Sequence, residues 1–312
     1  MRKRAMRHVG VSLAAVAVLA GAAGCAGGSD KAGAESRSSG SGGSGSAGGA
    51  RTPEQVITAA YKKTSAAKSA KVVMAVSAPA ATGVSMKAKS SGVMGWNPAA
   101  VDLVTEQDST GGPSGGARKR RTIWIDDVMY METGNAKKVT GKGWVTFDVP
   151  AAVKESGDAQ FVKQTATELE GMNDDPARKL ALLLYAPSIE DAGPEDVGGG
   201  RTEHYKGSFT VESVLSTAKN VAALTAEQRE QLLSNLKTKG IQEYAFDVWV
   251  NSAEYPVRIN TWAKSRKGVT TTSAEFSDYG TKLAVQAPPA DDTIGMLELV
   301  RAEQQQERDL DR

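Results

Sequence analysis

The sequence predicts an α+β fold in which helices pack against the apolar face of an antiparallel sheet. Two patterns in the 312 residues predict it. Apolar and polar residues alternate with a period of two over many short segments, as in strands that bury one face. Other segments repeat apolar residues at helical spacing and begin with capping residues. Because the strands follow one another across short turns, we expect a meander within one domain.

The first ordered element is expected to be a helix over residues 52–68. Thr52 can cap it, Pro53 fits its first turn, and Gln55 can return a hydrogen bond to the cap. The period then changes to two, and Val and Met residues occupy one face. The strands expected in this half are residues 72–78, 84–89, 92–96, 101–107, 122–125, 128–132 and 144–149.

Helical spacing interrupts the alternation in the middle of the chain, and the sheet then resumes. The helices expected there are residues 160–170, 177–185, 213–223 and 226–237. Asp175 and Pro176 can open the second of them, and Thr225 can cap the last. The strands expected next are residues 201–211, 244–251, 257–262 and a segment within 269–279. The charged tail after Pro289 is expected to fray.

Composition excludes several classes of protein. A single cysteine rules out an intramolecular disulfide and a thiolate zinc cluster, because each needs at least two thiols. Of the 38 basic side chains, four (Arg2, Lys3, Arg4 and Arg7) lie in a segment that we expect to be removed, which leaves 34 against 36 acidic groups. No electrostatic affinity for nucleic acid is therefore expected.

The first 25 residues have the layout of an export signal: a basic stretch, an apolar run over residues 9–20, and small residues before Cys25. The apolar run is too short for a permanent membrane span, which takes about 20 residues. A cysteine directly after Ala-Ala-Gly resembles the lipobox of bacterial lipoproteins, although Ala22 stands where leucine is usual. We therefore expect residues 1–24 to be cleaved. Cys25 would then carry a diacylglyceryl anchor with chains such as palmitate, on the extracytoplasmic face of the cell membrane. The alternative is a free thiol after an ordinary cleavage site.

The next segment, residues 25–51, is expected to be a flexible tether. It is mostly Gly and Ser with scattered charges, and it cannot bury enough apolar surface to fold. Residues 40–45 match the G-x-G-x-x-G dinucleotide fingerprint, but we reject this match because no strand precedes them and no helix follows. The rest of the chain divides into a domain over residues 52–292 and a charged tail over residues 293–312.

The sequence contains candidate catalytic residues, but none in a convincing arrangement. Ser114 lies in a G-x-S-x-G run within a Gly-rich hairpin loop, with no helix after it. Ser65 and Lys68 have the S-x-x-K spacing of penicillin-recognising enzymes but lack the partner motifs. His204, the only histidine outside the signal, is expected to be an ordinary strand residue. We therefore expect a protein that is not an enzyme and needs no cofactor or metal.

Several motifs resemble those of a known family. They are residues 247–251, 255–258, 270–280 and 287–289 near the end of the chain, with 129–131 and 142–145 in the central hairpins. This pattern is similar to actinobacterial lipoproteins of the LppX/LprAFG type, over most of residues 52–292. The resemblance implies a LolA-like shape, which is a curved antiparallel half-barrel whose concave face is covered by helices. It also implies that the acyl chains of a lipid or glycolipid bind between the sheet and the helices.

Candidate lining residues for such a cavity come from one face of the best strands and from the short helix at 177–185, which could act as a lid. They are Val72, Met74, Val76, Met86, Leu180, Leu183, Leu184, Phe246, Val248, Val250 and Ile259. Methionine adapts to irregular ligands, and Met94, Met129 and Met131 share the pattern. The five tryptophans could line the cavity or pack elsewhere. The basic run at 118–121 could meet anionic headgroups or be a solvated hairpin tip.

The expected function is that of a lipid-anchored, monomeric protein that binds or carries a lipid-like molecule. The alternative is an envelope sensor that uses the same surfaces to contact another protein, without lipid transport. An apolar cavity selects by volume and shape, so the alternation pattern leaves the identity of the ligand open. A Leu183→Trp change is expected to reduce lipid uptake at the mouth of the cavity without disturbing the fold.

Overall fold

The computed structural model describes residues 51–79, 86–109, 116–125, 127–134, 137–148, 151, 175–216 and 226–310. Its first element is helix α1 (Pro53–Ala67), and the predicted capping box is formed. The Thr52 hydroxyl accepts a hydrogen bond from the Gln55 backbone at 3.4 Å, and the Gln55 side chain accepts one from the Thr52 backbone at 3.0 Å. The sequence therefore determines where this helix begins.

Six strands form the first half of the sheet. They are β1 (Ser69–Ala78), β2 (Met86–Trp96), β3 (Ala99–Ser109), β4 (Gly116–Ile125), β5 (Val128–Glu132) and β6 (Trp144–Asp148), with a short helix α2 (Lys137–Thr140) before β6. These agree with the prediction, except that β2 is continuous through Gly92 and that β4 begins at Gly116 rather than at Thr122, so the basic run at 118–121 lies in a strand and not at a hairpin tip. A Cβ at Gly92 would lie 2.0 Å from the Asp102 carbonyl oxygen, so only glycine allows the neighbouring strand to approach so closely.

The second half contains the following elements: α5 (Pro176–Leu183), β7 (Ile189–Val197), β8 (Gly200–Thr210), α6 (Val211–Ser216), α7 (Ala226–Thr238), β9 (Ile241–Asn251), β10 (Pro256–Ser265) and β11 (Gly268–Ser277). Strand β7 was not predicted, because Gly193, Pro194 and acidic residues replace apolar alternation. It lies at the edge of the sheet, where charges and a bulge after Asp191 disfavour pairing with another chain. The helix predicted at 160–170 lies outside the described residues.

The end of the chain differs from the prediction. Residues 290–310 form a 3-10 turn η2 (Ala290–Asp292), a strand β12 (Thr293–Gly295) and a helix α8 (Met296–Leu310). The expectation of a fraying tail is wrong for these residues, because Ile294, Met296 and Leu299 are buried. Three apolar anchors in a highly charged segment are too few to stand out as a pattern. Strand β12 pairs in parallel with β6, so the sheet is antiparallel except at this edge.

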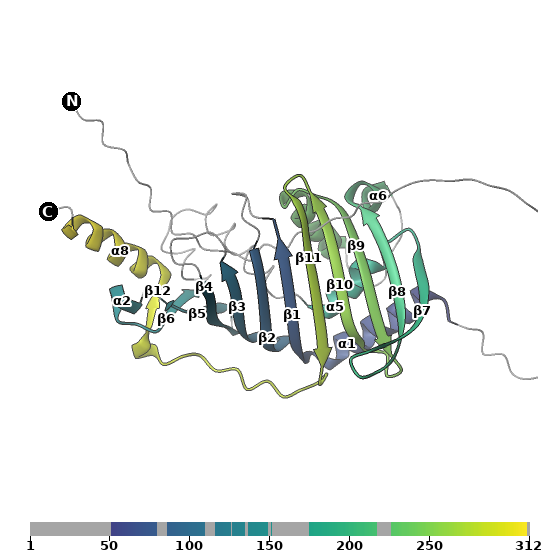
Figure 1. Ribbon diagram of the computed structural model, residues 1–312, viewed down its shortest axis with the longest axis horizontal. Helices are drawn as coiled ribbons and strands as arrows, with labels where there is room; N and C mark the ends of the chain where they lie inside the picture. The colour runs from purple at the N-terminus through teal and green to yellow at the C-terminus, as the bar shows by residue number, and fades with distance from the viewer. Residues whose placement is uncertain are drawn as a thin grey trace, which may run out of the picture.

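The strands form one open 12-stranded sheet in the order β12-β6-β5-β4-β3-β2-β1-β11-β10-β9-β8-β7 (Figure 1). Figure 1 shows α1, α5 and α6 on the same side of the sheet. Among the described elements, α1 packs chiefly on α5, while α6 and α7 pack on β9. The predicted class, an open antiparallel sheet with helices on one face, is confirmed. We call the side that carries these helices the inner face and the opposite side the outer face.

The segment that follows β11 crosses one end of strands β1 and β2. A Cβ at Gly95 would lie 2.3 Å from Cδ1 of Leu283, so glycine makes room for this crossing. Trp96 meets Tyr279 edge to face with ring centroids 6.3 Å apart, and the Tyr279 hydroxyl donates to the Pro256 carbonyl at 2.8 Å. Burial raises the pKa of Tyr279 well above its usual value. We call this end of the strands the closed end.

Candidate functional site on the inner face

Strand β1 shows how the sequence builds the inner face. Ala70, Val72 and Val76 are buried, whereas Lys71 and Val73 between them are exposed. Successive side chains of a strand point to opposite faces, so each strand contributes every second residue to the inner side. The period-two pattern in the sequence therefore produces one continuous apolar surface.

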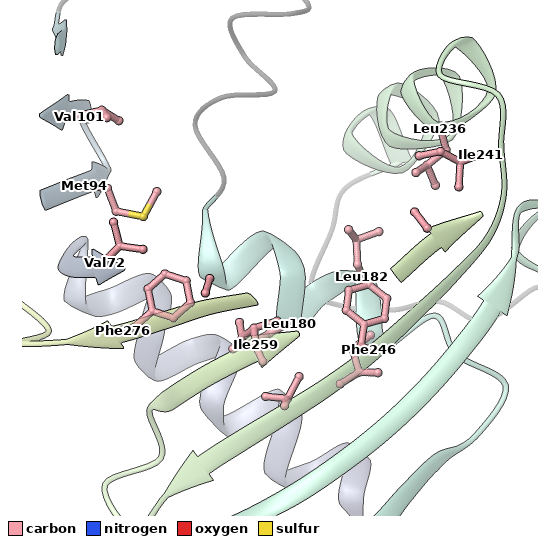
Figure 2. Packing of buried hydrophobic residues seen from close by; sticks show 14 of the residues in the cluster. Val72, Met94, Val101, Leu180, Leu182, Leu236, Ile241, Phe246, Ile259 and Phe276 are labelled. Atoms are coloured by element: carbon pink, nitrogen blue, oxygen red, sulfur yellow. The ribbon is translucent and has the colours of Figure 1, made fainter. Parts of the chain in front are cut away.

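The structure brings most of the predicted lining residues together. Val72, Leu180, Leu183, Phe246, Val248, Val250 and Ile259 belong to one buried cluster, and Met74 and Leu184 pack against it. Val76 is buried on the same face, and the side chain of Met86 lies outside the described part. Figure 2 shows Leu180 and Leu182 of α5 directed toward Ile259 and Phe246 of the sheet. Whether these residues contact a ligand stays a prediction.

Helix α5, the predicted lid, sits directly on the sheet. Leu180 and Leu183 are both 0% exposed. A Cβ at Gly207 of β8 would lie 2.6 Å from Cδ1 of Leu183 and 3.2 Å from Cβ of Ala186, so this glycine forms a notch for the helix. A tryptophan at position 183 would not fit that notch. The expectation that Leu183→Trp leaves the fold intact therefore does not hold for this geometry.

The apolar surface extends well beyond α5, toward the first half of the sheet. The strand register sets Met94, Val101, Trp124 and Met129 side by side on β2 to β5, near the closed end. All four are buried members of the same cluster as the α5 residues. We call these four residues the tryptophan row. None of the four was among the predicted lining residues: Met94 and Met129 were noted only as adaptable methionines, and the tryptophans were left unassigned. The hairpin between β4 and β5 already implies that Trp124 lies opposite Met129.

Trp124 has an unusual feature for a buried indole. It is 8% exposed, yet its Nε1 has no hydrogen-bond partner within the described part of the chain. The same holds for Nε1 of Trp96 at the closed end. A buried N–H without a partner costs free energy on the order of 1–3 kcal/mol, so each of these donors calls for an explanation.

Away from the closed end, the inner face becomes polar. Ser90 and Thr105, on neighbouring strands, are joined by a hydrogen bond of 2.8 Å between their hydroxyls. Thr261, Thr270 and Thr272 of β10 and β11 are also buried on this side. The inner face is therefore apolar at the closed end and rich in hydroxyl groups toward the other end of the strands.

The outer face carries a cluster of titratable groups around His204. The imidazole stacks on Trp249 with ring centroids 4.1 Å apart. Its Nδ1 lies 3.3 Å from Oε2 of Glu195, which also accepts a hydrogen bond of 2.7 Å from Nε1 of Trp249. Its Nε2 lies 3.5 Å from Oδ2 of Asp247. Burial raises the pKa of the Asp247 carboxyl, and His204 counteracts this shift. These contacts join the edge strand β7 to β8 and β9, which agrees with a structural role for His204.

Within the described part of the chain, the catalytic candidates Ser65 and Lys68 gain no catalytic partners. Ser65 lies in α1, and Lys68 is its C-cap in a left-handed conformation with φ 64°. Ser114 lies outside the described residues. The described ranges contain no cluster of three or more potential metal ligands. No helix in the same ranges is long and apolar enough to span a membrane.

Two hollows lie on the outer face, separate from the predicted cavity. One of about 810 Å³ is lined by Val73, Val93 and Tyr255, among others. Another of about 600 Å³ lies beside Lys87, Lys89 and other residues of β1, β2, β10 and β11. Both open away from α1 and α5, because their lining side chains alternate with the buried inner residues.

The fold and the inner face define a class of protein: an open antiparallel sheet whose helix-bearing face is lined with apolar side chains. No family model matches the chain. The chain is 27% identical over 259 residues to a 31.2 kDa protein of Streptomyces griseus from the rplA-rplJ intergenic region, covering 80% of this chain and 81% of the relative. It is 24% identical over 232 residues to a candidate lipoprotein of Streptomyces coelicolor, covering 71% and 68%.

Two solved structures of lipoproteins are also similar. LprF from Mycobacterium bovis aligns over 76% of this chain and 97% of its own, with a TM-score of 0.42 and 14% identity. LppX from Mycobacterium tuberculosis aligns over 75% and 97%, with a TM-score of 0.41 and 11% identity. Both are lipoproteins of the type that the sequence motifs resemble.

Proposed function

We propose that the protein is a lipoprotein, anchored through Cys25 on the extracytoplasmic face of the cell membrane, that binds a lipid or another apolar molecule between the sheet and its helices. The observation that carries this proposal is the extension of the apolar inner face past α5 to the tryptophan row. The residues of the tryptophan row are buried by the chain itself, so an acyl chain would bind there by taking the place of covering residues along a continuous apolar surface.

Burial of an acyl chain on such an apolar surface is favourable in free energy. Burying one methylene group is worth about 0.8 kcal/mol, so an acyl chain laid along several strands gains affinity from its length alone. Methionine side chains, such as Met94 and Met129 in the tryptophan row, adapt to chains of different shape. We propose binding without catalysis, because Ser65 and Lys68, the candidates within the described residues, have no catalytic arrangement around them.

The proposed location rests on the N-terminal sequence and on the name of the Streptomyces coelicolor relative. Changing Cys25→Ser should block anchoring, because the sulfur atom is the attachment point. Fractionation of cells that express each form should find the parent protein in the membrane after a high-salt wash, and the variant released or unprocessed. A variant that is cleaved after Gly24 and stays bound in high salt would contradict the lipobox.

The binding function is tested by native mass spectrometry of the full chain, purified from membranes in a mild detergent. The parent protein should retain lipid or take it up from mixed micelles. Met94→Gln, which replaces an inner-face side chain by a polar one of similar size, should lower lipid occupancy severalfold. Val93→Gln, its neighbour on the outer face, is the matched control and should retain full occupancy. A parent protein that neither retains nor takes up lipid would refute the proposal and favour the interaction-module alternative.

A further inference from the structure

The inner face has a basic end as well as an apolar one. Four residues before Trp124 on the same strand, the register sets Ser90, Thr105 and Arg120 side by side on β2, β3 and β4. We call these three residues the arginine row. Strands advance about 3.4 Å per residue, so the two rows lie about 13 Å apart along β4. Both rows face the same side, because their separation is an even number of residues.

The basic run at 118–121 is divided between the two faces. On the outer face, Lys119 lies 3.4 Å from Glu106, and Arg121 forms two hydrogen bonds with Asp102 at 2.7 and 2.8 Å. The contact with Asp102 raises the pKa of Arg121. Arg120, between them, is exposed on the inner face and has no ion pair within the described ranges. The two neighbours are therefore structural, whereas Arg120 retains a free guanidinium group.

The hydroxyl groups beside Arg120 can also donate. Ser90 is 7% exposed, and its Oγ lies 2.8 Å from Oγ1 of Thr105. A single hydrogen bond between two hydroxyls uses one of their two protons, so one O–H remains to donate. A guanidinium group with an adjacent hydroxyl donor is a suitable arrangement for the oxygen atoms of a phosphate.

The unpartnered indole of Trp124 indicates a second polar group of the ligand. Its Nε1–H is a donor only, so it can be satisfied by an acceptor oxygen but not by a hydrocarbon chain. Nε1 is enclosed by the protein, so a ligand that displaces the covering atoms gains a hydrogen bond there if it carries an acceptor near the start of its apolar portion. An ester carbonyl between a phosphate headgroup and an acyl chain has this property.

We propose that the inner face binds a phosphate-bearing acyl lipid, with the phosphate at the arginine row, an ester carbonyl at Nε1 of Trp124, and the acyl chain directed toward the closed end. The inference rests on the proposed lipid-binding function and specifies the ligand class for the same site. It gives Arg120 and Trp124 separate roles: Arg120 selects the charge, and Trp124 recognises the ester linkage.

The role of Arg120 is tested with two lipids of identical acyl chains, phosphatidylglycerol and the phosphate-free diacylglycerol, bound to the full chain in neutral detergent. The parent protein should prefer the anionic lipid about tenfold, as expected for charge-assisted hydrogen bonds at an exposed site. Arg120→Gln should abolish the preference, and Arg120→Lys should restore part of it. Lys119→Gln removes the same charge from the outer face and should leave the preference unchanged.

The role of Trp124 is tested with ester-linked and ether-linked forms of phosphatidylglycerol. Trp124→Phe keeps an aromatic ring but removes the donor. It should weaken binding of the ester-linked lipid about fivefold, the usual effect of one hydrogen bond, and leave the ether-linked lipid unaffected. An equal loss for both lipids would show that Trp124 acts through packing alone and would overturn the ester assignment.

These experiments distinguish a wrong headgroup assignment from a wrong lipid-binding function. If both lipids bind equally and Arg120→Gln changes neither affinity, the headgroup assignment is wrong while the lipid-binding function stands. If neither lipid binds, the proposed function itself fails. Soluble glycerol phosphate serves as the headgroup alone and should not displace bound lipid at millimolar concentration. Displacement at that level would identify a phosphate site independent of acyl chains.

Discussion

The two halves of the inner face are built by the same alternation but are completed in different ways. Over β8 to β10, helix α5 fills the surface, and its Leu183 fits the notch at Gly207. Over β2 to β5, the tryptophan row ends in a buried indole N–H without a partner among the described residues, and the strands continue to hydroxyl groups and Arg120. Apolar alternation therefore does not distinguish a packed core from a binding surface. The fit of a helix against the sheet does, because Leu183 of α5 fills the notch at Gly207 as a close-packed core requires.

Leu180→Ala should have the largest effect, and it acts on the packed half. The side chain is 0% exposed and lies against Ile259, so its loss leaves a cavity that costs about 2–5 kcal/mol. Denaturant unfolding of the variant measures this cost. Lipid bound per folded molecule should not change. A variant that keeps its stability but loses its lipid would reverse the assignment of the two halves.

Gly207→Ala tests the seating of α5 with a smaller change. The new Cβ would lie 2.6 Å from Leu183, and relieving this overlap should cost about 1–3 kcal/mol of unfolding free energy. Gly200→Ala on the same strand is the matched control, because a Cβ there meets no atom within 4 Å. Equal stability of the two variants would mean that α5 moves away from β8 without cost, as a lid would.

Much of the fold was predictable because it depends on local patterns. The capping box at Thr52 and the alternation in β1, β9 and β10 determine where these elements begin and which face they bury. Strand β7 and helix α8 were missed, because an edge strand needs charge rather than apolar alternation, and α8 is held by only a few apolar contacts.

The candidate site was predictable only in part, because it depends on register between strands. The predicted residues came from strands whose alternation is strong, and most of them form the cluster around α5. Arg120 and Trp124 lie on β4, where a basic run and a Gly-rich loop conceal the alternation. Their common face follows from their even separation once β4 is known to begin at Gly116, and pairing with β3 places Asp102 and Glu106 against the outward basic residues.

Met131→Ala tests the half of the inner face that is proposed to bind lipid. Met131 lies on the inner face of β5, is only partly buried, and packs against the cluster, so shortening it should reduce contact with an acyl chain more than it harms the core. We expect lipid affinity to fall about fivefold, or roughly the loss of one to two buried methylene groups. Val128→Ala on the outer side of the same strand is the control. Native mass spectrometry of both variants should separate them, and equal occupancy would contradict the proposed path of the chain.

The smallest expected effect comes from the outer face, which serves as a reference outside both halves. Burial raises the pKa of Asp247 above the ordinary value of 3.8, while His204 and Lys206 oppose the shift and Glu195 adds to it. A carboxyl whose folded pKa is raised binds its proton more tightly in the native state. Its stabilising contribution is therefore complete below the unfolded pKa and is lost as the pH rises through the folded pKa.

Asp247→Asn removes this pH-dependent loss and should raise the melting temperature slightly at pH 7, with a difference that shrinks toward pH 4. Asp196→Asn, at an exposed residue of β7, is the control for the loss of one surface carboxyl. Lipid binding should be the same in both variants, because Asp247 lies on the face opposite to the tryptophan row. A fall in lipid occupancy for Asp247→Asn, with no change in the melting temperature, would show that the outer face takes part in binding. The lipid-binding surface would then extend to the outer face around Asp247.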